Sequence, residues 1–275
     1  MGGGRSNGDM SSDAWSPPEI AARVERAGVA KARAGTLRLL LLAVLAGAFI
    51  ALGGLFYLAV VTDSALGWGP TRLLGGLAFA LGLGLVVVGG AELFTGNNLV
   101  AMAWASGRIR GAELLRNWAL VYVGNALGAA ATALLAHLAG LARLADGALG
   151  RTAASLARDK VALGALEGWA RGVLCNALVC LAVWLAFGGR SVSDKLAAVA
   201  LPVAAFVALG LEHCVANFFF LPFGAWSGAG GEAALGTGAW RNLCCVSVGN
   251  LCGGGLLVAG VYWLAYLGPG RESAD

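Results

Sequence analysis

Charged residues are scarce in this chain. Asp, Glu, Lys and Arg make up only 12% of its 275 residues, whereas soluble domains carry about a quarter. Apolar residues account for 59%, and the mean hydropathy is +0.77. This composition excludes an ordinary soluble domain. The net charge of +4 is small and forms no basic stripe, which also argues against nucleic-acid binding. The composition therefore predicts an integral membrane protein whose main partner is the lipid bilayer.

The six cysteines show neither CxxC nor Cys/His metal spacing. All of them lie in apolar runs, so we expect small core side chains, with no disulfide, metal site or cofactor. His213 beside Cys214 is the one Cys/His candidate for a membrane-embedded enzyme. Adjacent helical residues point in different directions, so we expect no catalytic site and no enzyme. Glycine is abundant, with 44 residues, and would let membrane helices approach closely.

The few charges divide the chain into apolar runs, which can be compared with the about 20 residues that cross a bilayer. Four uncharged runs can each span: 39–62, 117–142, 172–189 and 242–270. Two further stretches, 73–107 and 196–231, are interrupted by Glu92 and Glu212. Each of these stretches is longer than one crossing requires, whereas each of its two pieces is at most barely long enough for one. We therefore predict an all-α protein of six transmembrane helices, of which the second and fifth are broken.

The positions of Lys and Arg favour a cytoplasmic location for both termini. The expected organisation is a cytoplasmic tail (1–36), a first three-helix repeat (37–142), a periplasmic loop (143–167), a second three-helix repeat (168–268) and a cytoplasmic tail (269–275). Within the first tail, Ser16-Pro17-Pro18-Glu19 is a capping-box pattern, which predicts an interfacial helix at about 16–33. A partly disordered tail is the alternative.

Two motifs recur along the chain. Gly-x-Glu-x4-Asn occurs at 90–97 and again at 210–217, an offset of 120. Arg-Asn at 116–117, followed by Val-Gly-Asn-x-x-Gly at 123–128, recurs at 241–242 and 248–253, an offset of 125. Because one repeat holds three crossings, an odd number, the second copy would run through the membrane with opposite polarity. Such an inverted repeat is typical of transport proteins, and half-helix N-termini at its centre favour anions.

Several short motifs are spread over residues 37–267: Ala91-Glu92-Leu93-Phe94-Thr95, Ala105-Ser106-Gly107-Arg108-Ile109, Arg116-Asn117-Trp118, Leu174-Cys175-Asn176, 179–184, Gly189-Arg190-Ser191, Asp194-Lys195, Glu212-His213, Ala216-Asn217 and Gly249-Asn250. Together they resemble the formate/nitrite transporter family. The resemblance implies a homopentamer of aquaporin-like protomers in a bacterial inner membrane. Each protomer would have its own pore for small monovalent anions such as formate, nitrite, bisulfide or lactate.

The resemblance also implies the residues of the pathway. The loop that breaks the second span would be a gate that carries Thr95. The residues that would narrow the pore around a central His213 are Phe79, Leu83 and Phe206. Lys160 would concentrate anions outside the pore or polarise the histidine. Asn176 and Asn250 are pore candidates by their family position.

Physical chemistry adds a reason for His213, because an imidazole at membrane depth can donate a hydrogen bond or pass a proton to a weak-acid anion. The alternative is a core histidine bonded to backbone carbonyls. An exposed carboxylate would repel an anion. Glu92 and Glu212 are therefore expected to accept bonds from backbone N–H groups at the helix breaks, with Asn97 and Asn217 as further braces.

The choice of permeant anion is less determined than the family. Formate ranks first because Thr95, His213 and the apolar pore residues are all retained. The sequence Gly96-Asn97-Asn98 after Thr95 departs from the small hydroxyl residues of formate-selective members, so nitrite and then bisulfide stay open. No Asn-Pro occurs in the chain, which argues against a neutral-solute channel, and a single deep histidine argues against an ammonium conduit.

Overall fold

The structure is a computed structural model of the chain that describes residues 14–228 and 236–268. Over these residues it is helical, without a strand. Its helices are α1 (Pro17–Ala32), α2 (Thr36–Val61), α3 (Trp68–Gly89), α4 (Ala101–Ala105), α5 (Gly111–Leu138), α6 (Ala148–Ala162), α7 (Ala165–Gly188), α8 (Val192–Ala208), α9 (Cys214–Ser227), α10 (Thr237–Leu251) and α11 (Val261–Tyr266). Short 3₁₀ turns are η1 (Gly96–Val100) and η2 (Leu141–Arg143), and the π-helix η4 (Cys252–Gly260) joins α10 to α11.

Five helices are long and apolar enough to cross a membrane. They are α2, α3, α5, α7 and the continuous helix Thr237–Tyr266 made of α10, η4 and α11. The shorter α9 is also apolar. Large apolar side chains such as Phe56, Leu127 and Leu256 are exposed on the outside of the bundle, as expected where lipid is the solvent. The predicted class, an all-α membrane protein, is confirmed.

Glycine allows the long helices to pack backbone against backbone. A side chain at Gly128 of α5 would overlap the carbonyl of Val44 in α2. In α10 and η4, side chains at Gly249 and Gly253 would overlap the carbonyls of Trp169 and Val173 in α7. The pairs α2/α5 and α7/α10 can therefore approach closely, which is the role expected for glycine in membrane helices.

Two helices end partway along a predicted span. Helix α3 stops at Gly89, and residues 90–95 form no regular helix before η1 begins. Helix α8 stops at Ala208, and α9 begins at Cys214. Each helix is followed by a glycine in the left-handed conformation, Gly90 (φ +73°) and Gly210 (φ +67°), where a side chain would be strained. The two interruptions carry the recurring Gly-x-Glu motif.

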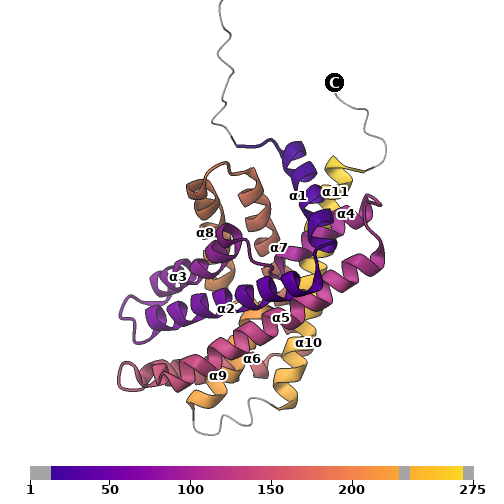
Figure 1. The fold of residues 1–275 in the computed structure, drawn as a ribbon. Coiled ribbons are helices and arrows are strands. Elements are labelled where there is room, and N and C mark those ends of the chain that lie inside the picture. Colours follow the sequence, from indigo (N-terminus) through magenta and orange to yellow (C-terminus); the bar gives the residue numbers. More distant parts are fainter. Residues whose placement is uncertain (1–13, 229–235, 269–275) are drawn as a thin grey trace, which may run out of the picture.

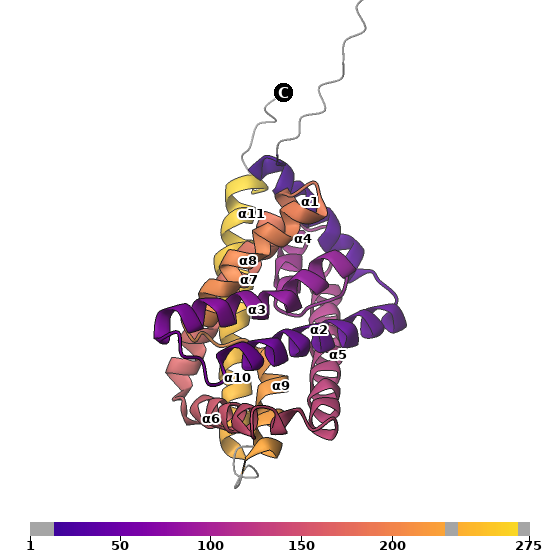
Figure 2. The ribbon, with the colours of Figure 1, turned by 90° about the vertical axis from the view of Figure 1, so that its left-hand side faces the viewer.

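Two shorter helices occupy opposite ends of the molecule. Helix α1 lies beside α4 and α11 at one end, whereas α6 packs on α9 at the other (Figures 1 and 2). At the start of α1, the Ser16 N–H donates to Glu19 Oε2 at 2.9 Å, which confirms the predicted capping box. Residues 1–13, 229–235 and 269–275 lie outside the described part, so the predicted tail 1–36 is seen only in part and the predicted tail 269–275 falls wholly outside the described residues.

The cysteine prediction is confirmed for only some of the six residues. Cys175, Cys180 and Cys214 are buried, as expected for small core side chains. Cys244 of α10 is exposed. No group of three or more possible metal ligands occurs among the described residues.

Candidate functional site

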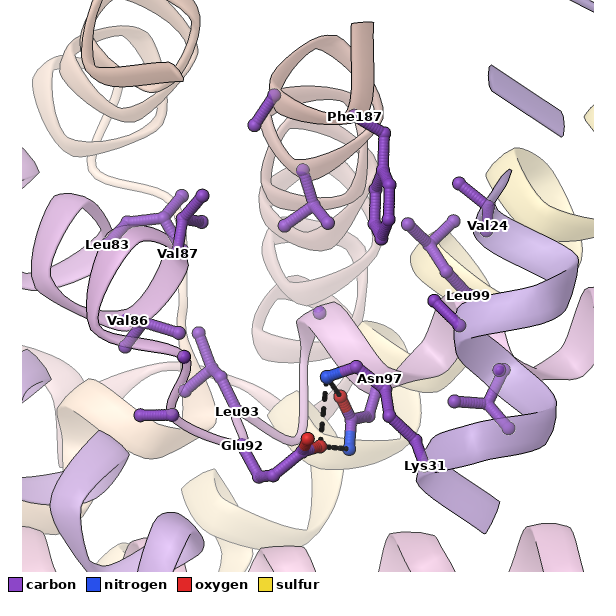
Figure 3. Close-up of a pocket in the computed structure, with 18 of the residues that line it drawn as sticks. Val24, Lys31, Leu83, Val86, Val87, Glu92, Leu93, Asn97, Leu99 and Phe187 are labelled. Carbon is purple, nitrogen blue, oxygen red and sulfur yellow. Dashed lines mark hydrogen bonds and ion pairs between the residues drawn. The ribbon is translucent and has the colours of Figure 1, made fainter. Parts of the chain in front are cut away.

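A pocket of 340 Å³ opens at the α1 end of the bundle, and we call it the α1-side pocket. Its walls come from α1, the end of α3 and the interruption 90–95, and they are largely apolar (Figure 3). At its floor, Lys31 Nζ lies 2.9 Å from Glu92 Oε2 and 2.9 Å from Asn97 Oδ1. Asn97 Nδ2 also donates to the same carboxylate oxygen, at 2.7 Å. The Glu92 carboxylate is thus neutralised by a lysine and held by an amide.

A second pocket, of 280 Å³, opens at the α6 end, and we call it the α6-side pocket. Here Lys160 Nζ on α6 lies 2.7 Å from Glu212 Oε1, and both side chains are almost fully buried. Asn217 Nδ2 donates to Glu212 Oε2 at 2.7 Å and to Asn242 Oδ1 at 2.8 Å. The lysine and glutamate that line the first pocket therefore recur in the second, and a matching asparagine, Asn217, bonds to the carboxylate.

The fourth member of each cluster also matches. Asn117 Nδ2 donates to the carbonyl of Lys31 at 3.1 Å, and Asn242 Nδ2 donates to the carbonyl of Lys160 at 3.0 Å. We call the two sets the Lys31 cluster (Lys31, Glu92, Asn97, Asn117) and the Lys160 cluster (Lys160, Glu212, Asn217, Asn242). The two clusters hold the two helix interruptions in the same way.

The carboxylates are not bonded as the sequence suggested. We expected Glu92 and Glu212 to accept from backbone N–H groups, and this prediction is wrong, because their side chains face lysine and asparagine. The backbone N–H groups of Phe94 and Cys214 donate instead to Asn125 Oδ1 at 2.8 Å and Asn250 Oδ1 at 3.0 Å. At each interruption a neutral asparagine side chain accepts the free backbone N–H, so the nearby carboxylate is available to pair with a lysine.

The two interruptions meet at a buried polar contact between Thr95 and His213. His213 Nδ1 accepts the backbone N–H of Ala216 at 3.1 Å, so in the neutral ring the proton is on Nε2. Nε2 lies 3.0 Å from Thr95 Oγ1, and both side chains are buried. With the ring as donor, the threonine hydroxyl keeps its own proton for another acceptor.

Apolar side chains surround this contact. The Phe206 ring stacks on the His213 ring with 5.9 Å between the ring centroids, and the Phe79 ring meets the Phe206 ring edge-on with 5.7 Å between the centroids. These three residues line the α6-side pocket, whereas Leu83, one helical turn along α3 from Phe79, lines the α1-side pocket. Of the residues named from the family resemblance, Phe79, Phe206, His213 and Lys160 line the α6-side pocket and Leu83 lines the α1-side pocket.

Asn176 and Asn250 lie beside this region but line neither pocket. Both are fully buried. Asn176 Nδ2 donates to the carbonyl of Asn250 at 2.7 Å and to Asn98 Oδ1 at 3.0 Å, and Asn250 Nδ2 donates to the carbonyl of Gly172 at 2.8 Å. Their amides are occupied by protein atoms, so in this structure they brace the loops.

Sequence reasoning missed Lys31, which it assigned only to the N-terminal tail. One signal was present, because Lys31 precedes the first span much as Lys160 precedes the fourth. It also missed Arg72 and Arg171, which line the α6-side pocket. These two arginines lie next to apolar spans, where a charge is costly unless it has a partner.

Two pockets open at opposite ends of a helical membrane bundle, and a buried polar contact lies between them, an arrangement typical of a channel or transporter. The chain belongs to the formate/nitrite transporter family, whose model, described as formate/nitrite transporter, matches residues 18–264. The family expected from the sequence motifs is confirmed, as is the expectation that the protein is not an enzyme.

Known relatives agree with this assignment. The formate channel FocA of Escherichia coli K12 is 40% identical over 91% of this chain and 94% of its own length. A probable formate transporter of Methanothermobacter thermautotrophicus is 36% identical over 94% of this chain and 99% of its own. A solved pentameric formate channel with formate bound is 40% identical, with a TM-score of 0.74 over 85% of this chain and 98% of that chain. An ion channel of the same family reaches a TM-score of 0.82 at 28% identity, over 90% and 98%.

Proposed function

We propose that this protein conducts small monovalent weak-acid anions, formate first, through a pore in each protomer of a homopentamer in a bacterial inner membrane. The observation that carries the proposal is the buried Thr95–His213 contact between two oppositely placed pockets. The names of the relatives support formate as the permeant, and the pentameric relative supports the assembly. Nitrite is the second candidate, because Gly96-Asn97-Asn98 after Thr95 departs from the small hydroxyl residues of formate-selective members.

The proposed architecture has six crossings in an inverted repeat of aquaporin-like form. The second crossing is α3 with η1 and α4, and the fifth is α8 with α9. The matching Lys31 and Lys160 clusters at opposite ends of the bundle support this arrangement. The α1 end would be cytoplasmic, with α1 as the interfacial helix of tail 1–36, and the α6 end would be periplasmic, within loop 143–167. The repeats would cover 37–142 and 168–268, and 269–275 would form the cytoplasmic C-terminal tail.

In the proposed mechanism, an anion enters the α6-side pocket, where the charge of Lys160 is paired with Glu212 and serves to polarise His213. The Phe79 and Phe206 rings then exclude hydrated cations, because an apolar constriction offers no replacement for their water. At the centre, His213 Nε2 and the Thr95 hydroxyl supply hydrogen bonds. A proton taken up with the anion from the same solution would neutralise it and leave with it on the other side, so the histidine is unchanged overall. Neutralisation removes the cost of carrying a charge through apolar surroundings.

The proposed gate is the interruption 90–95 with Thr95, closed toward the α1-side pocket by Leu83. No atom lies within 4 Å of the position that a side chain on Gly90 would occupy, so the chain is loosely packed where this segment begins. Glu92, Asn97, Glu212 and Asn217 would hold the two interruptions in shape. Asn176 and Asn250 would act on the pathway through the loops that they brace.

The test of this function is flux into proteoliposomes that contain the purified full-length protein. Initial uptake of formate, nitrite and bisulfide is measured at external pH about 7 and about 5, on either side of the usual histidine pKa, with empty liposomes as the control. We expect formate uptake well above the control, with a pH dependence that His213→Ala alters and the surface variant His137→Ala preserves. Absence of flux for all three anions from an assembled protein would refute the proposal.

A further inference from the structure

Two arginines from different helices converge on the end of α8. Arg72 on α3 donates from Nε to the carbonyl of Ala208 at 2.9 Å and from Nη2 to that of Val207 at 3.0 Å. Arg171 on α7 donates from Nη1 to the carbonyl of Gly210 at 3.2 Å. The last carbonyls of a helix lack partners within that helix. At the end of α8, guanidinium groups supply these partners.

The end of α8 is also a wall of the α6-side pocket, to which Val207, Gly210 and both arginines contribute. A helix C-terminus carries a partial negative charge, because its carbonyl dipoles all point outward. Left alone, this end would repel an anion at the mouth of the pathway. Arg72 and Arg171 place positive charge at this helix end, so an arriving anion meets positive rather than negative charge there.

The two positive groups lie close together. Arg72 Nη2 and Arg171 Nη1 are 3.0 and 3.9 Å from the point that a side chain on Gly210 would occupy. Arg171 Nη2 is paired with Glu167 Oε1 at 2.6 Å, and Lys160 is paired with Glu212. Arg72 Nη1 donates to the Tyr57 hydroxyl at 3.4 Å, and Asp159 also lines the pocket. Among the described residues Arg72 has no carboxylate at ion-pair distance, so it is the main positive charge still available to a ligand in this pocket, with Arg171 Nη1 beside it.

The other end of the bundle is built differently. Glu92 and Glu212, which follow α3 and α8, are 120 residues apart, and with this offset Arg72 of α3 corresponds to Val192 of α8. Lys31 and Lys160 are 129 residues apart, and with this offset Arg171 corresponds to Leu42. The arginine pair is thus an addition to one end, not a part of the shared framework.

We propose that Arg72 and Arg171 form the first docking site for a small carboxylate or oxyanion at the α6-side mouth, ahead of Lys160 and His213. The proposal rests on the function proposed above. It assigns recruitment of the anion to this half-buried pair rather than to exposed arginines of the same end, such as Arg158. The pair thereby sets the concentration at which the pathway fills.

The experiment compares formate uptake by proteoliposomes with wild-type protein and with the variants Arg72→Gln, Arg171→Gln and the double variant. Each single variant should raise the half-saturating formate concentration about threefold to tenfold, the double variant more, with the maximal rate changed less than about twofold. The variants should also lose part of the decrease in uptake that added salt causes in the wild type, because salt screens exposed charges. A role in folding alone would lower the maximal rate or the yield of assembled protein instead.

Two controls keep the outcome decisive. Arg158→Gln removes one exposed charge from α6 outside the pocket and should leave half-saturation unchanged. Arg72→Lys keeps the charge but loses the paired hydrogen bonds of the guanidinium to the α8 carbonyls, and its half-saturating concentration should stay closer to the wild-type value than that of Arg72→Gln. Unchanged half-saturation in the double variant, or an equal shift in Arg158→Gln, would overturn the docking site while wild-type uptake still supports the channel. Absence of wild-type uptake would overturn the function, and the docking site with it.

Discussion

The Lys31 and Lys160 clusters use the same four residue types, yet they lie in different surroundings. The Lys31 side chain is 29% exposed, whereas that of Lys160 is 9% exposed. Asn97 Oδ1 accepts a bond from Lys31, whereas Asn217 Oδ1 has no partner among the described residues. The two clusters thus share their residue types, but the lysine of the Lys31 cluster is more exposed to solvent than the lysine of the Lys160 cluster.

The central contact shows the same principle more sharply. With the offset of 120, His213 corresponds to Leu93 and Thr95 corresponds to Val215. Each half supplies one polar side chain where the other half has an apolar one, and these two polar residues bond across the centre. The positions at which the halves agree hold the fold, and the positions at which they differ carry the chemistry that we propose.

The largest expected effect comes from removing the lysines. Lys160→Met leaves the buried Glu212 without its cation and should lower the free energy of unfolding by about 3–5 kcal/mol. Lys31→Met should cost less, roughly 1–3 kcal/mol, because water can reach Glu92. Denaturant unfolding of the two detergent-solubilised variants measures the difference. An equal or greater loss in Lys31→Met would contradict the burial argument.

A smaller effect is expected at the glycines that follow the interrupted helices. Gly90→Ala and Gly210→Ala both place a residue with a side chain in the left-handed backbone conformation, and each should lower the free energy of unfolding by about 1–2 kcal/mol. Only at Gly210 does the new methyl group meet the Arg72 guanidinium. Gly210→Ala should therefore also raise the half-saturating formate concentration in uptake assays, whereas Gly90→Ala should not. The same change in both variants would show that the arginine contact is irrelevant.

The central contact can be tested by making one half resemble the other. Thr95→Val introduces the residue found at position 215 and removes a buried hydrogen bond worth about 1 kcal/mol. Formate uptake should decrease about fivefold, and its pH dependence should change, because His213 Nε2 loses its acceptor. The matched variant Val215→Thr should keep the wild-type pH dependence. If both variants keep it, the bond to His213 has no part in conduction.

The smallest effect concerns the exposed start of α1. Glu19 accepts the Ser16 hydroxyl at 2.6 Å and the Ser16 backbone N–H at 2.9 Å, and these bonds lower the pKa of the carboxyl below its ordinary value of 4.5. A lowered folded-state pKa contributes stability above pH 4.5 that is lost as the pH falls through the folded value. Glu19→Gln should thus be slightly less stable than wild type at neutral pH and equal to it in acid. A constant difference in thermal unfolding between these pH values would be unexpected.

Much of the candidate site followed from local patterns. The two Gly-x-Glu motifs pointed to broken spans, and each motif begins within two residues after the end of a helix, α3 or α8. The partners of Glu92 and Glu212 could not be predicted, because the sequence shows a carboxylate in an apolar run but not which donor reaches it. Backbone N–H groups were the nearest candidates along the chain. Lysines from α1 and α6 provide the actual partners.

The sequence by itself determined the membrane class, the apolar spans and the family, because hydropathy and short motifs are properties of consecutive residues. Only the tertiary structure decided the contacts that matter to the site. Lys31 is 61 residues from Glu92, Thr95 is 118 from His213, and Arg72 is 136 from the Ala208 carbonyl. Hydrogen bonds and ion pairs act over a few ångströms, and helix packing alone brings such distant atoms within that range.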